Sequence, residues 1–557
     1  MKFISIYIRF TLLLLFVGML LPAFNAAAKP KPKLADKPKL VVGIVVDQMR
    51  YDFLYRYWNK YGEGGFKRLV KEGFQYTNTH YNYVPTYTGP GHASIYTGTT
   101  PSVHGIIAND WYNRELDRLI YCTEDKKAQT VGSNTLSGQM SPANLWVTTI
   151  TDELKLATNQ KAKVIGVCLK DRGSILPAGH AADAAYWYDG SLGGWISSTF
   201  YMQQLPQWVQ DFNNKKTAAA YLQQTWKTLL PIDQYTESTA DDTPFEVPFA
   251  AGTKPVFPYN LSQLKGDSYN LLRSTPFGNS YTKDFAIATL EAEKMGKGQV
   301  TDFLAVSFSS TDYIGHQFGP NSIEVEDTYL RLDKDLAELL SYLDKYVGKD
   351  NVLVFLSSDH GVAHVPAYLQ SLRIPAGSAN GSMMLDSVNR YLESEYGKGR
   401  WIVSYSNQQV FLNHPLITAK KHNLKEMQEK VAQFLIRFDG VARTVTASAL
   451  AGSYWQSGII SLVQQGHHQK RSGDVIVVSQ PGWFEGYGSS PAKGSTHGSA
   501  ANYDTHVPLL FYGWKVKAGE STRKAYITDI APTLANWLKI QEPNGTTGQA
   551  LPEGLNP

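Results

Sequence analysis

The chain of 557 residues has a formal net charge of +4, and 43% of its residues are hydrophobic and 12% aromatic. This composition supports a large buried core and excludes an intrinsically disordered protein. A charge so near neutrality also argues against a general nucleic-acid-binding protein, which needs a strongly basic surface. With only two cysteines, Cys122 and Cys168, the chain is neither a disulfide scaffold nor a Cys-based zinc protein, although the two thiols could pair.

The first 28 residues have the pattern of a signal peptide. Lys2 and Arg9 accompany an apolar run from Phe10 to Leu21, and small residues follow up to Ala28, where we expect cleavage. The run is too short to span a membrane comfortably, and no Cys near the cleavage site offers a lipid anchor. We therefore expect a periplasmic or secreted protein with no stable membrane anchor. Cleavage would lower the formal net charge to +2, because residues 1–28 contain no acid.

Hydrophobic patterning divides the rest of the chain into an α/β core and two insertions. Short apolar runs that end at polar residues are typical of buried strands in a sheet covered on both faces. Residues 189–275 have poor periodicity and many Trp, Tyr, Pro and Gly, so we interpret them as a cap that helps to wall a site. The predicted organisation is a Lys- and Pro-rich linker at 29–38, core segments at 39–188, 276–364 and 474–557, and insertions at 189–275 and 365–473. An amphipathic helix is predicted over Glu324–Val347.

The first predicted strand, Leu40–Val46, ends at a carboxylate, Asp47. In open α/β sheets, ligands gather at the carboxyl ends of strands. Thr88 precedes Gly89-Pro90-Gly91 and a short predicted helix, where free N–H groups favour a phosphate-like anion. We hypothesise that Asp47 holds a metal and that Thr88 is a nucleophile on the same metal. The alternative is that the two residues only cap a loop and a helix.

Three further residues suit an anionic substrate. Lys170 and Arg172 follow the predicted strand Val164–Leu169, and their spacing of two would point both side chains the same way in an extended segment. Arginine offers a bidentate fork to phosphate oxygens. Asn109 is expected in a loop after an apolar pair, where its amide could donate to an anion. The alternative for the two cations is a solvated strand terminus.

The remaining candidate metal ligands also follow predicted strands. Asp312 and His316 are four residues apart, which places both side chains on one face of a helical turn. Asp359 and His360 are adjacent after the predicted strand Asn351–Leu356, and His497 lies in a Gly- and Ser-rich loop. In a single α/β sheet these positions converge on one edge. Three other histidines are expected to be structural: His92, His104 and His364.

The order D…T-G-P-G-H…N-D…K-D-R…D-x-x-x-H…D-H-G…T-H-G resembles the alkaline phosphatase superfamily, in particular its PafA-type periplasmic phosphatases. The resemblance extends from Leu40 to Leu538. No C-x-P-S-R signature is present, which disfavours a formylglycine sulfatase. The fold that this resemblance implies is an α/β fold with an alkaline-phosphatase-like central β-sheet, flanked by helices on both faces and carrying cap segments.

The resemblance also implies two Zn²⁺ per chain. One would be held by Asp312, His316 and His497, and the other by Asp47, Asp359 and His360, with Thr88 bound to it. Asn109, Lys170 and Arg172 would hold the phosphoryl oxygens. Zinc accepts imidazole nitrogen and carboxylate oxygen, and two ions roughly 4 Å apart clamp the attacking and leaving oxygens of an in-line displacement. Coordination would also make the weakly acidic Thr88 hydroxyl a nucleophile.

The predicted function is a zinc-dependent alkaline phosphatase that hydrolyses small-molecule phosphate monoesters through a covalent phospho-threonine intermediate. The Lys/Arg pair resembles the monoesterase arrangement, and diesterase relatives lack it. One alternative keeps the metals but acts as a phosphodiesterase or nucleotide pyrophosphatase. Another is a non-catalytic exported protein that binds phosphate or metal on the same fold. Nothing in the sequence indicates nucleic-acid-specific binding or specifies an oligomeric state.

Overall fold

The computed structural model describes residues 36–264, 266, 268–485 and 493–555. The expected signal peptide at 1–28 and residues 29–35 of the expected linker lie outside this range. Among the described residues, no helix combines the length and the apolar character that crossing a lipid bilayer requires.

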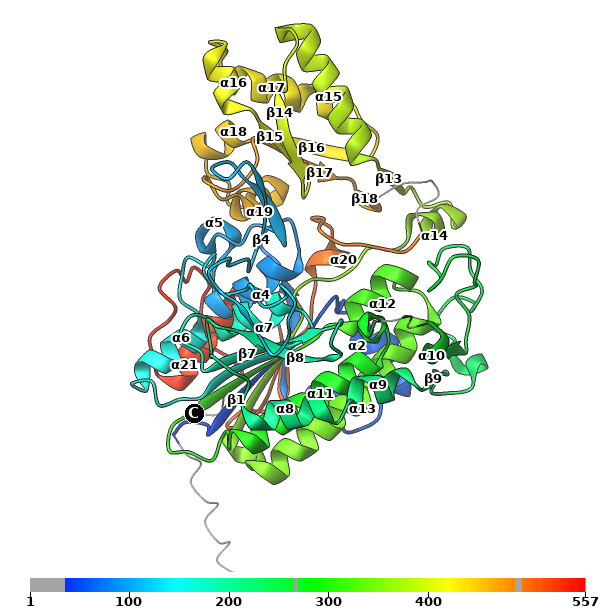
Figure 1. The fold of residues 1–557 in the computed structure, drawn as a ribbon, viewed down its shortest axis with the longest axis vertical. Coiled ribbons are helices and arrows are strands. Elements are labelled where there is room, and N and C mark those ends of the chain that lie inside the picture. The colour runs from blue at the N-terminus through cyan, green and yellow to red at the C-terminus, as the bar shows by residue number, and fades with distance from the viewer. Residues whose placement is uncertain (1–35, 265, 267, 486–492, 556–557) are drawn as a thin grey trace, which may run out of the picture. The chain divides into compact units, whose positions relative to one another are not determined.

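A ten-stranded mixed sheet forms the centre of the described chain (Figure 1). Its order is β20-β2-β19-β12-β1-β11-β6-β7-β8-β5. The four strands that precede most of the predicted site residues are adjacent and parallel: β12 (Val352–Ser357), β1 (Leu40–Val46), β11 (Asp302–Phe308) and β6 (Val164–Cys168). The others are β2 (Phe74–His80), β5 (Thr130–Val131), β7 (Ala184–Asp189), β8 (Gly194–Ser198), β19 (Leu509–Gly513) and β20 (Gly519–Tyr526). β19 runs antiparallel to β12, and β8 runs antiparallel to β7.

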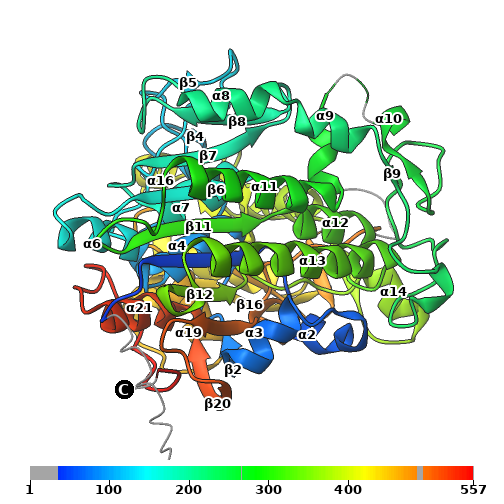
Figure 2. The ribbon, with the colours of Figure 1, turned by 90° about the horizontal axis from the view of Figure 1, so that it is seen from below.

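Strand β1 shows that both faces of the sheet are covered. Leu40, Val42, Ile44 and Val46 belong to one buried cluster, whereas Val41 and Val45 belong to another. The first face packs against α2 (Phe53–Arg56), α3 (Phe66–Glu72), α11 (Phe277–Ala292) and α13 (Ile323–Tyr346), and Figure 2 shows α11 and α13 running side by side along it. The second face packs against α4 (Thr88–Thr97), α6 (Ile150–Ala157) and α21 (Ile530–Leu538). The prediction of a central sheet flanked by helices on both faces is confirmed.

Residues from the predicted insertion at 365–473 contribute to a second, four-stranded sheet of order β14-β15-β17-β16. Its strands are β14 (Ile402–Ser406), β15 (Gln409–Leu412), β16 (Val441–Thr446) and β17 (Val475–Ser479), and α15 (Gly381–Tyr396) and α17 (Leu424–Leu435) cover one face. We expected Val475–Ser479 to open the last core segment, but it pairs with β15 and β16 instead. The reason is that β17 is buried on both faces, because α19 (Gly458–Gly466) covers its other side. Such a strand has the same pattern as a strand of the central sheet.

The predicted cap at 189–275 has little regular structure after β8, which belongs to the central sheet. It contains α8 (Gln207–Asn214), α9 (Thr217–Leu222), η2 (Ile232–Gln234), α10 (Leu261–Leu264) and η3 (Asn270–Ser274). A two-stranded pair, β9 (Thr225–Trp226) with β10 (Tyr259–Asn260), completes it. The remaining domain boundaries stay predictions.

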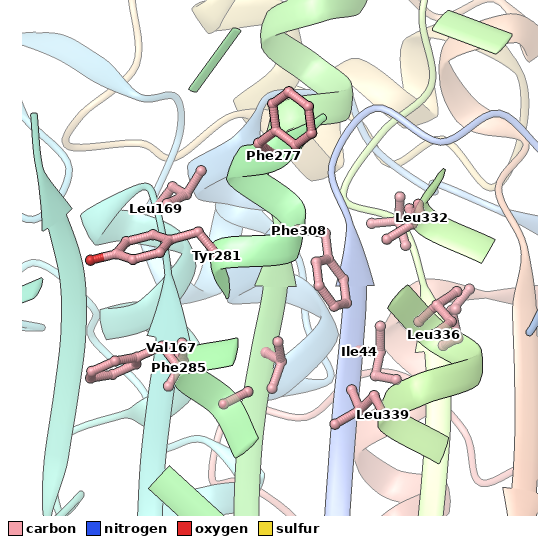
Figure 3. Packing of buried hydrophobic residues seen from close by; sticks show 14 of the residues in the cluster. Ile44, Val167, Leu169, Phe277, Tyr281, Phe285, Phe308, Leu332, Leu336 and Leu339 are labelled. Atoms are coloured by element: carbon pink, nitrogen blue, oxygen red, sulfur yellow. The ribbon is translucent and has the colours of Figure 1, made fainter. Parts of the chain in front are cut away.

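Substitutions on helix α13 test the packing of the core, because the buried side chains of this helix face β1. Figure 3 shows Leu336 and Leu339 next to Ile44, with Leu332 farther along the direction of β1. We expect Leu336→Ala to lower the free energy of unfolding by about 2–5 kcal/mol, because it removes a fully buried side chain and leaves a cavity. Lys334→Ala, on the exposed side of the same helix, should change it by less than about 0.5 kcal/mol. Urea unfolding curves of the two variants give the comparison, and equal stabilities would contradict this packing.

Candidate active site

Four neighbouring strands bring the predicted site residues to one edge of the central sheet. Asp359 and His360 follow β12, Asp47 follows β1, Asp312 and His316 lie on α12 (Ser310–Phe318) directly after β11, and Lys170 follows β6. His497 comes from the segment before α20 (Asn502–Thr505). The expected convergence therefore results from the strand order, which puts all four carboxyl ends next to one another.

The first ligand cluster consists of Asp47, Asp359 and His360, whose ligand atoms all lie within 4.8 Å of one another. His360 Nε2 lies 3.6 Å from Asp47 Oδ1 and 3.6 Å from Asp359 Oδ2. Both oxygens are buried and have no hydrogen-bond partner among the described residues, which is costly for a carboxylate. These spacings fit a tetrahedral Zn²⁺, whose ligands at about 2.0–2.2 Å lie roughly 3.3–3.6 Å apart. The donor set therefore fits a metal ion.

The second cluster consists of Asp312, His316 and His497, with the same limit of 4.8 Å between ligand atoms. Asp312 Oδ1 lies 3.1 Å from His316 Nε2 and 3.7 Å from His497 Nε2. The rings of His497 and His360 stack with their centroids 3.5 Å apart, so the two clusters are direct neighbours. The two groupings are those expected from the sequence.

Backbone carbonyls fix the orientation of the three histidine rings. The Nδ1 atoms of His360, His316 and His497 lie 3.0, 2.7 and 2.6 Å from the carbonyl oxygens of Gly361, Ser495 and Thr86. A carbonyl only accepts, so each Nδ1 carries a proton, and in a neutral ring Nε2 then keeps its lone pair toward the carboxylates. Burial opposes the charged form of His316, but the neighbouring Asp312 carboxylate outweighs it and raises the pKa of His316. Burial lowers the pKa of His497 to about 3 and the pKa of His360 well below its ordinary value, which keeps these rings neutral.

Lys170 links the two clusters. Its Nζ lies 2.6 Å from Asp47 Oδ2 and 2.6 Å from Asp312 Oδ2. Burial opposes the ammonium form, but the charges of Asp312 and Asp47 outweigh it and raise the pKa of Lys170. Burial and the Asp312 charge raise the pKa of Asp47 to about 6, although Lys170 acts in the opposite direction. One buried cation therefore stands among three buried carboxylates.

The predicted geometry of the Lys/Arg pair was wrong, because the segment is not extended throughout. Lys170 precedes the first turn of α7 (Asp171–Ala178), and Arg172 is already inside that turn. Helix geometry sends the two side chains to different partners, since Arg172 Nη1 donates to Tyr121 Oη over 2.8 Å. Within the described chain, Arg172 has no carboxylate at ion-pair distance and its buried Nε–H has no partner.

Thr88 lies where the two clusters meet the start of α4. It is the first residue of the helix rather than its N-cap, and its Oγ1 is 3.4 Å from His360 Nε2. Asn109 Oδ1 accepts from the N–H of Gly89 over 2.8 Å, which ties the amide to the same helix start. Gly91 lets α4 pack closely against the backbone of Asp359, because a Cβ at this position would lie 2.3 Å from the Asp359 carbonyl oxygen.

The histidines expected to be structural are bonded within the protein. His92 is bonded to Thr88 O and Ser307 Oγ, His104 to Ser94 Oγ, and His364 to Arg50 and Asn321. Cys122 and Cys168 are both free thiols.

Two residues of the site were missed in the sequence. Gln48 Nε2 donates to Asp312 Oδ1 over 2.7 Å, and Tyr121 holds Arg172. Gln48 could have been predicted from the sequence, because it directly follows the strand-end residue Asp47. No sequence feature pointed to Tyr121. A cavity of about 760 Å³ beside α17 and α19 is lined by none of the predicted site residues. The site is therefore identified by the chemistry of its side chains and not by the volume of a cavity.

Comparisons with known proteins agree with this geometry. The model of the family described as type I phosphodiesterase / nucleotide pyrophosphatase matches residues 41–500. The chain is 47% identical to alkaline phosphatase PafA of Elizabethkingia meningoseptica, over 94% of this chain and 95% of that protein. It is 46% identical to alkaline phosphatase PhoV of Synechococcus elongatus, over 94% of both chains. It is 49% identical to a protein of Myroides odoratus named calcium-transporting ATPase, over 96% of this chain and 97% of that protein.

Solved structures extend the comparison to the fold. The crystal structure of wild-type PafA superposes with a TM-score of 0.90 at 47% identity, covering 93% of this chain and 99% of that chain. Murine ectonucleotide pyrophosphatase/phosphodiesterase 5 shares the fold at a TM-score of 0.51 and 15% identity, over 93% of this chain and 97% of that chain.

Gly91 gives a test of the first ligand cluster that does not alter a ligand. We expect Gly91→Ala to weaken Zn²⁺ binding by about 10- to 100-fold, because the new methyl group displaces Asp359. Competition with a chelating dye, combined with metal analysis, measures the affinity. Gly298→Ala is the matched control, because a Cβ at Gly298 meets nothing within 4 Å. Unchanged affinity in a folded Gly91→Ala protein would contradict the assignment of Asp359.

Proposed function

The chain belongs to the type I phosphodiesterase / nucleotide pyrophosphatase family, and from this premise we propose that it is a zinc-dependent alkaline phosphatase acting on phosphate monoesters. We further propose that it works through a covalent phospho-Thr88 intermediate and that it is exported to the periplasm or secreted. The observation that carries the proposal is the pair of three-residue ligand clusters beside the Thr88 hydroxyl.

The residues of the chain divide the chemistry among them. Asp47, Asp359 and His360 would hold one Zn²⁺ next to Thr88, and Asp312, His316 and His497 would hold the other. When bound, the two ions would supply positive charge to the attacking and leaving oxygens and would lower the pKa of water. Thr88 Oγ1 attacks phosphorus and displaces the alcohol, and water later attacks the phospho-threonine from the vacated side. The backbone carbonyls that fix the histidine rings keep the ligand nitrogens in place throughout.

Three other side chains serve the phosphoryl group. Asn109 is bonded to the start of the helix that carries Thr88, and Lys170 lies against Asp47 and Asp312. Arg172 is buried and has only Tyr121 as a hydrogen-bond partner among the described residues, so its other donors are available to an anion. A monoester dianion gains more from these cations than a diester, which carries one charge fewer. This favours phosphomonoesterase activity over the alternative, a phosphodiesterase or nucleotide pyrophosphatase.

The Myroides odoratus relative bears a different name, a calcium-transporting ATPase. The phosphatase proposal rests on the site and on the two relatives named as alkaline phosphatases. ATP belongs in the substrate panel beside an aryl phosphate for this reason.

The nucleophile is tested by removing the Thr88 hydroxyl. We expect Thr88→Ala to lower kcat for phenyl phosphate at alkaline pH by at least about 10³-fold, because no covalent intermediate can form. Thr88→Ser, which keeps a hydroxyl, should retain a substantial part of the turnover. Rapid acid quenching with ³²P-labelled substrate should leave label on the wild-type and Ser proteins and none on the Ala protein.

Metal removal supplies the control for this experiment. Chelation should abolish turnover by the wild-type protein, and added Zn²⁺ should restore it. Wild-type turnover in Thr88→Ala, or full activity after complete metal removal, would contradict the proposal.

Arg172 tests the preference for monoesters. Lys170 is less suitable, because its removal would also free two metal-binding carboxylates. We expect Arg172→Ala to lower kcat/KM for phenyl phosphate about 10- to 100-fold more than kcat/KM for methyl phenyl phosphate, since the dianion loses more on removal of a cation. Arg390→Ala, at an exposed position of α15, removes the same charge elsewhere and should leave both values unchanged. Equal losses on the two esters in Arg172→Ala would remove the argument for a monoesterase.

A further inference from the structure

A second feature of the site is a cavity of about 350 Å³ at the carboxyl ends of β6 and β7. Its size lies within the roughly 300–1,000 Å³ of small-molecule sites. Lys170 and Arg172, which we assign to the phosphoryl oxygens, also line this cavity. A phosphate ester bound by these two residues would therefore have room beside it for the rest of its body.

Aromatic side chains form much of the cavity wall: Tyr121, Trp187, Tyr188 and Tyr313. Tyr313 lies under Lys170, with Nζ 5.0 Å from the ring centroid. Trp187 and Tyr188 are consecutive residues of β7, so their side chains point to opposite faces of the sheet, and both are almost fully buried. The aromatic surface open to a ligand therefore comes mainly from Tyr121 and Tyr313, which are partly exposed. Such a wall suits the apolar or planar part of a small molecule.

The residues that line the cavity include more cations than carboxylates. Its lining contains Lys170, Arg172 and Arg273 but a single carboxylate, Asp171. The Asp171 oxygens accept from Tyr121 Oη over 2.9 Å and from Thr123 Oγ1 over 2.6 Å. Within the described chain, neither arginine has a carboxylate within 4.0 Å.

Arg273 lies on η3, in the predicted cap, and is held in a fixed orientation. Its Nη2 donates to the carbonyl oxygen of Tyr188 over 2.8 Å, and its Nη1 donates to Asn270 Oδ1 over 3.0 Å. The guanidinium carbon lies 5.4 Å from the centroid of the Tyr188 ring. Guanidinium has five N–H donors, so these two bonds leave donors for a ligand.

We propose that this cavity is a substrate subsite that selects phosphate monoesters bearing a second anionic group, which binds Arg273. The inference rests on the proposed phosphatase function and deepens it, because it names the substrate class. A merely structural Arg273 would explain the bond to Tyr188. It would not explain a guanidinium without a carboxylate in the same cavity as the cations of the phosphoryl site.

The test compares two aryl phosphates, of which one carries an added carboxymethyl group with the second charge. Phenyl phosphate lacks it, and 4-(carboxymethyl)phenyl phosphate carries it on a methylene group that leaves the acidity of the phenol nearly unchanged. We expect the wild-type protein to have the higher kcat/KM on the carboxymethyl compound. Arg273→Gln should lower that value about tenfold, mainly through KM, with little change for phenyl phosphate.

Two further variants complete the design. Arg273→Lys keeps the charge but not the fork, so its ratio of kcat/KM values should lie between those of the wild type and Arg273→Gln. If Arg273→Gln does not fold, the ratio measured for Arg273→Lys tests the subsite by itself. Arg390→Gln removes one positive charge from exposed α15 and should leave the ratio at the wild-type value.

The outcomes separate this inference from the function on which it rests. Phosphate release from both compounds, with a ratio that the Arg273 variants do not change, would overturn the subsite and leave the phosphatase intact. A wild-type protein that releases phosphate from neither compound would overturn both. A selective loss on the carboxymethyl compound in Arg273→Gln, absent from Arg390→Gln, supports the subsite.

Discussion

The strand order β12-β1-β11-β6 puts three buried carboxylates, Asp359, Asp47 and Asp312, next to one another at one edge of the central sheet. Burying charges at such distances costs several kcal/mol for each ion unless cations compensate it. Lys170, which follows the next strand, supplies a cation, and two of the carboxylates keep an oxygen without a partner among the described residues. This arrangement favours the binding of cations, and it fits the metal ions that we propose for this edge.

Lys170 makes the site a single electrostatic unit rather than two separate clusters. Its ammonium group contacts one carboxylate from each cluster, and the rings of His360 and His497 stack across the same boundary. A change of charge in one cluster is therefore felt in the other, since the dielectric screening between buried groups is weak. Arg172 stands outside this pairing, with Tyr121 as its hydrogen-bond partner, which is why we propose it as the cation that responds to the substrate.

The sequence allowed us to predict which side chains converge where aspartates and histidines directly follow a buried strand. Asp47, Asp312, Asp359 and their histidines were predicted because short apolar runs mark buried strands, and because the carboxyl ends of parallel strands share one edge. Prediction failed where tertiary packing decides. Val475–Ser479 was included in the core segment 474–557, but it pairs in the second sheet, since burial on both faces does not reveal the pairing partner. Arg172 was expected on an extended segment, but α7 begins one residue after Lys170.

The cap is the part that periodicity could not describe, and its contacts explain why. After β8, its described residues form no strand other than the short pair β9-β10, and its side chains pack on the core: Trp226 Nε1 donates to Asp327 on α13, and Tyr259 Oη donates to Glu324. Its backbone reaches the metal-binding edge, because Val247 N–H donates to Gln317 O and Phe245 O accepts from Gly494 N–H, next to the segments that carry His316 and His497. A segment held by such isolated contacts has no hydrophobic periodicity in its sequence. It can nevertheless hold a single side chain, such as that of Arg273, at a defined position. Under the proposed function, the regular core would supply the reacting groups, and the irregular cap would supply the residue that distinguishes substrates.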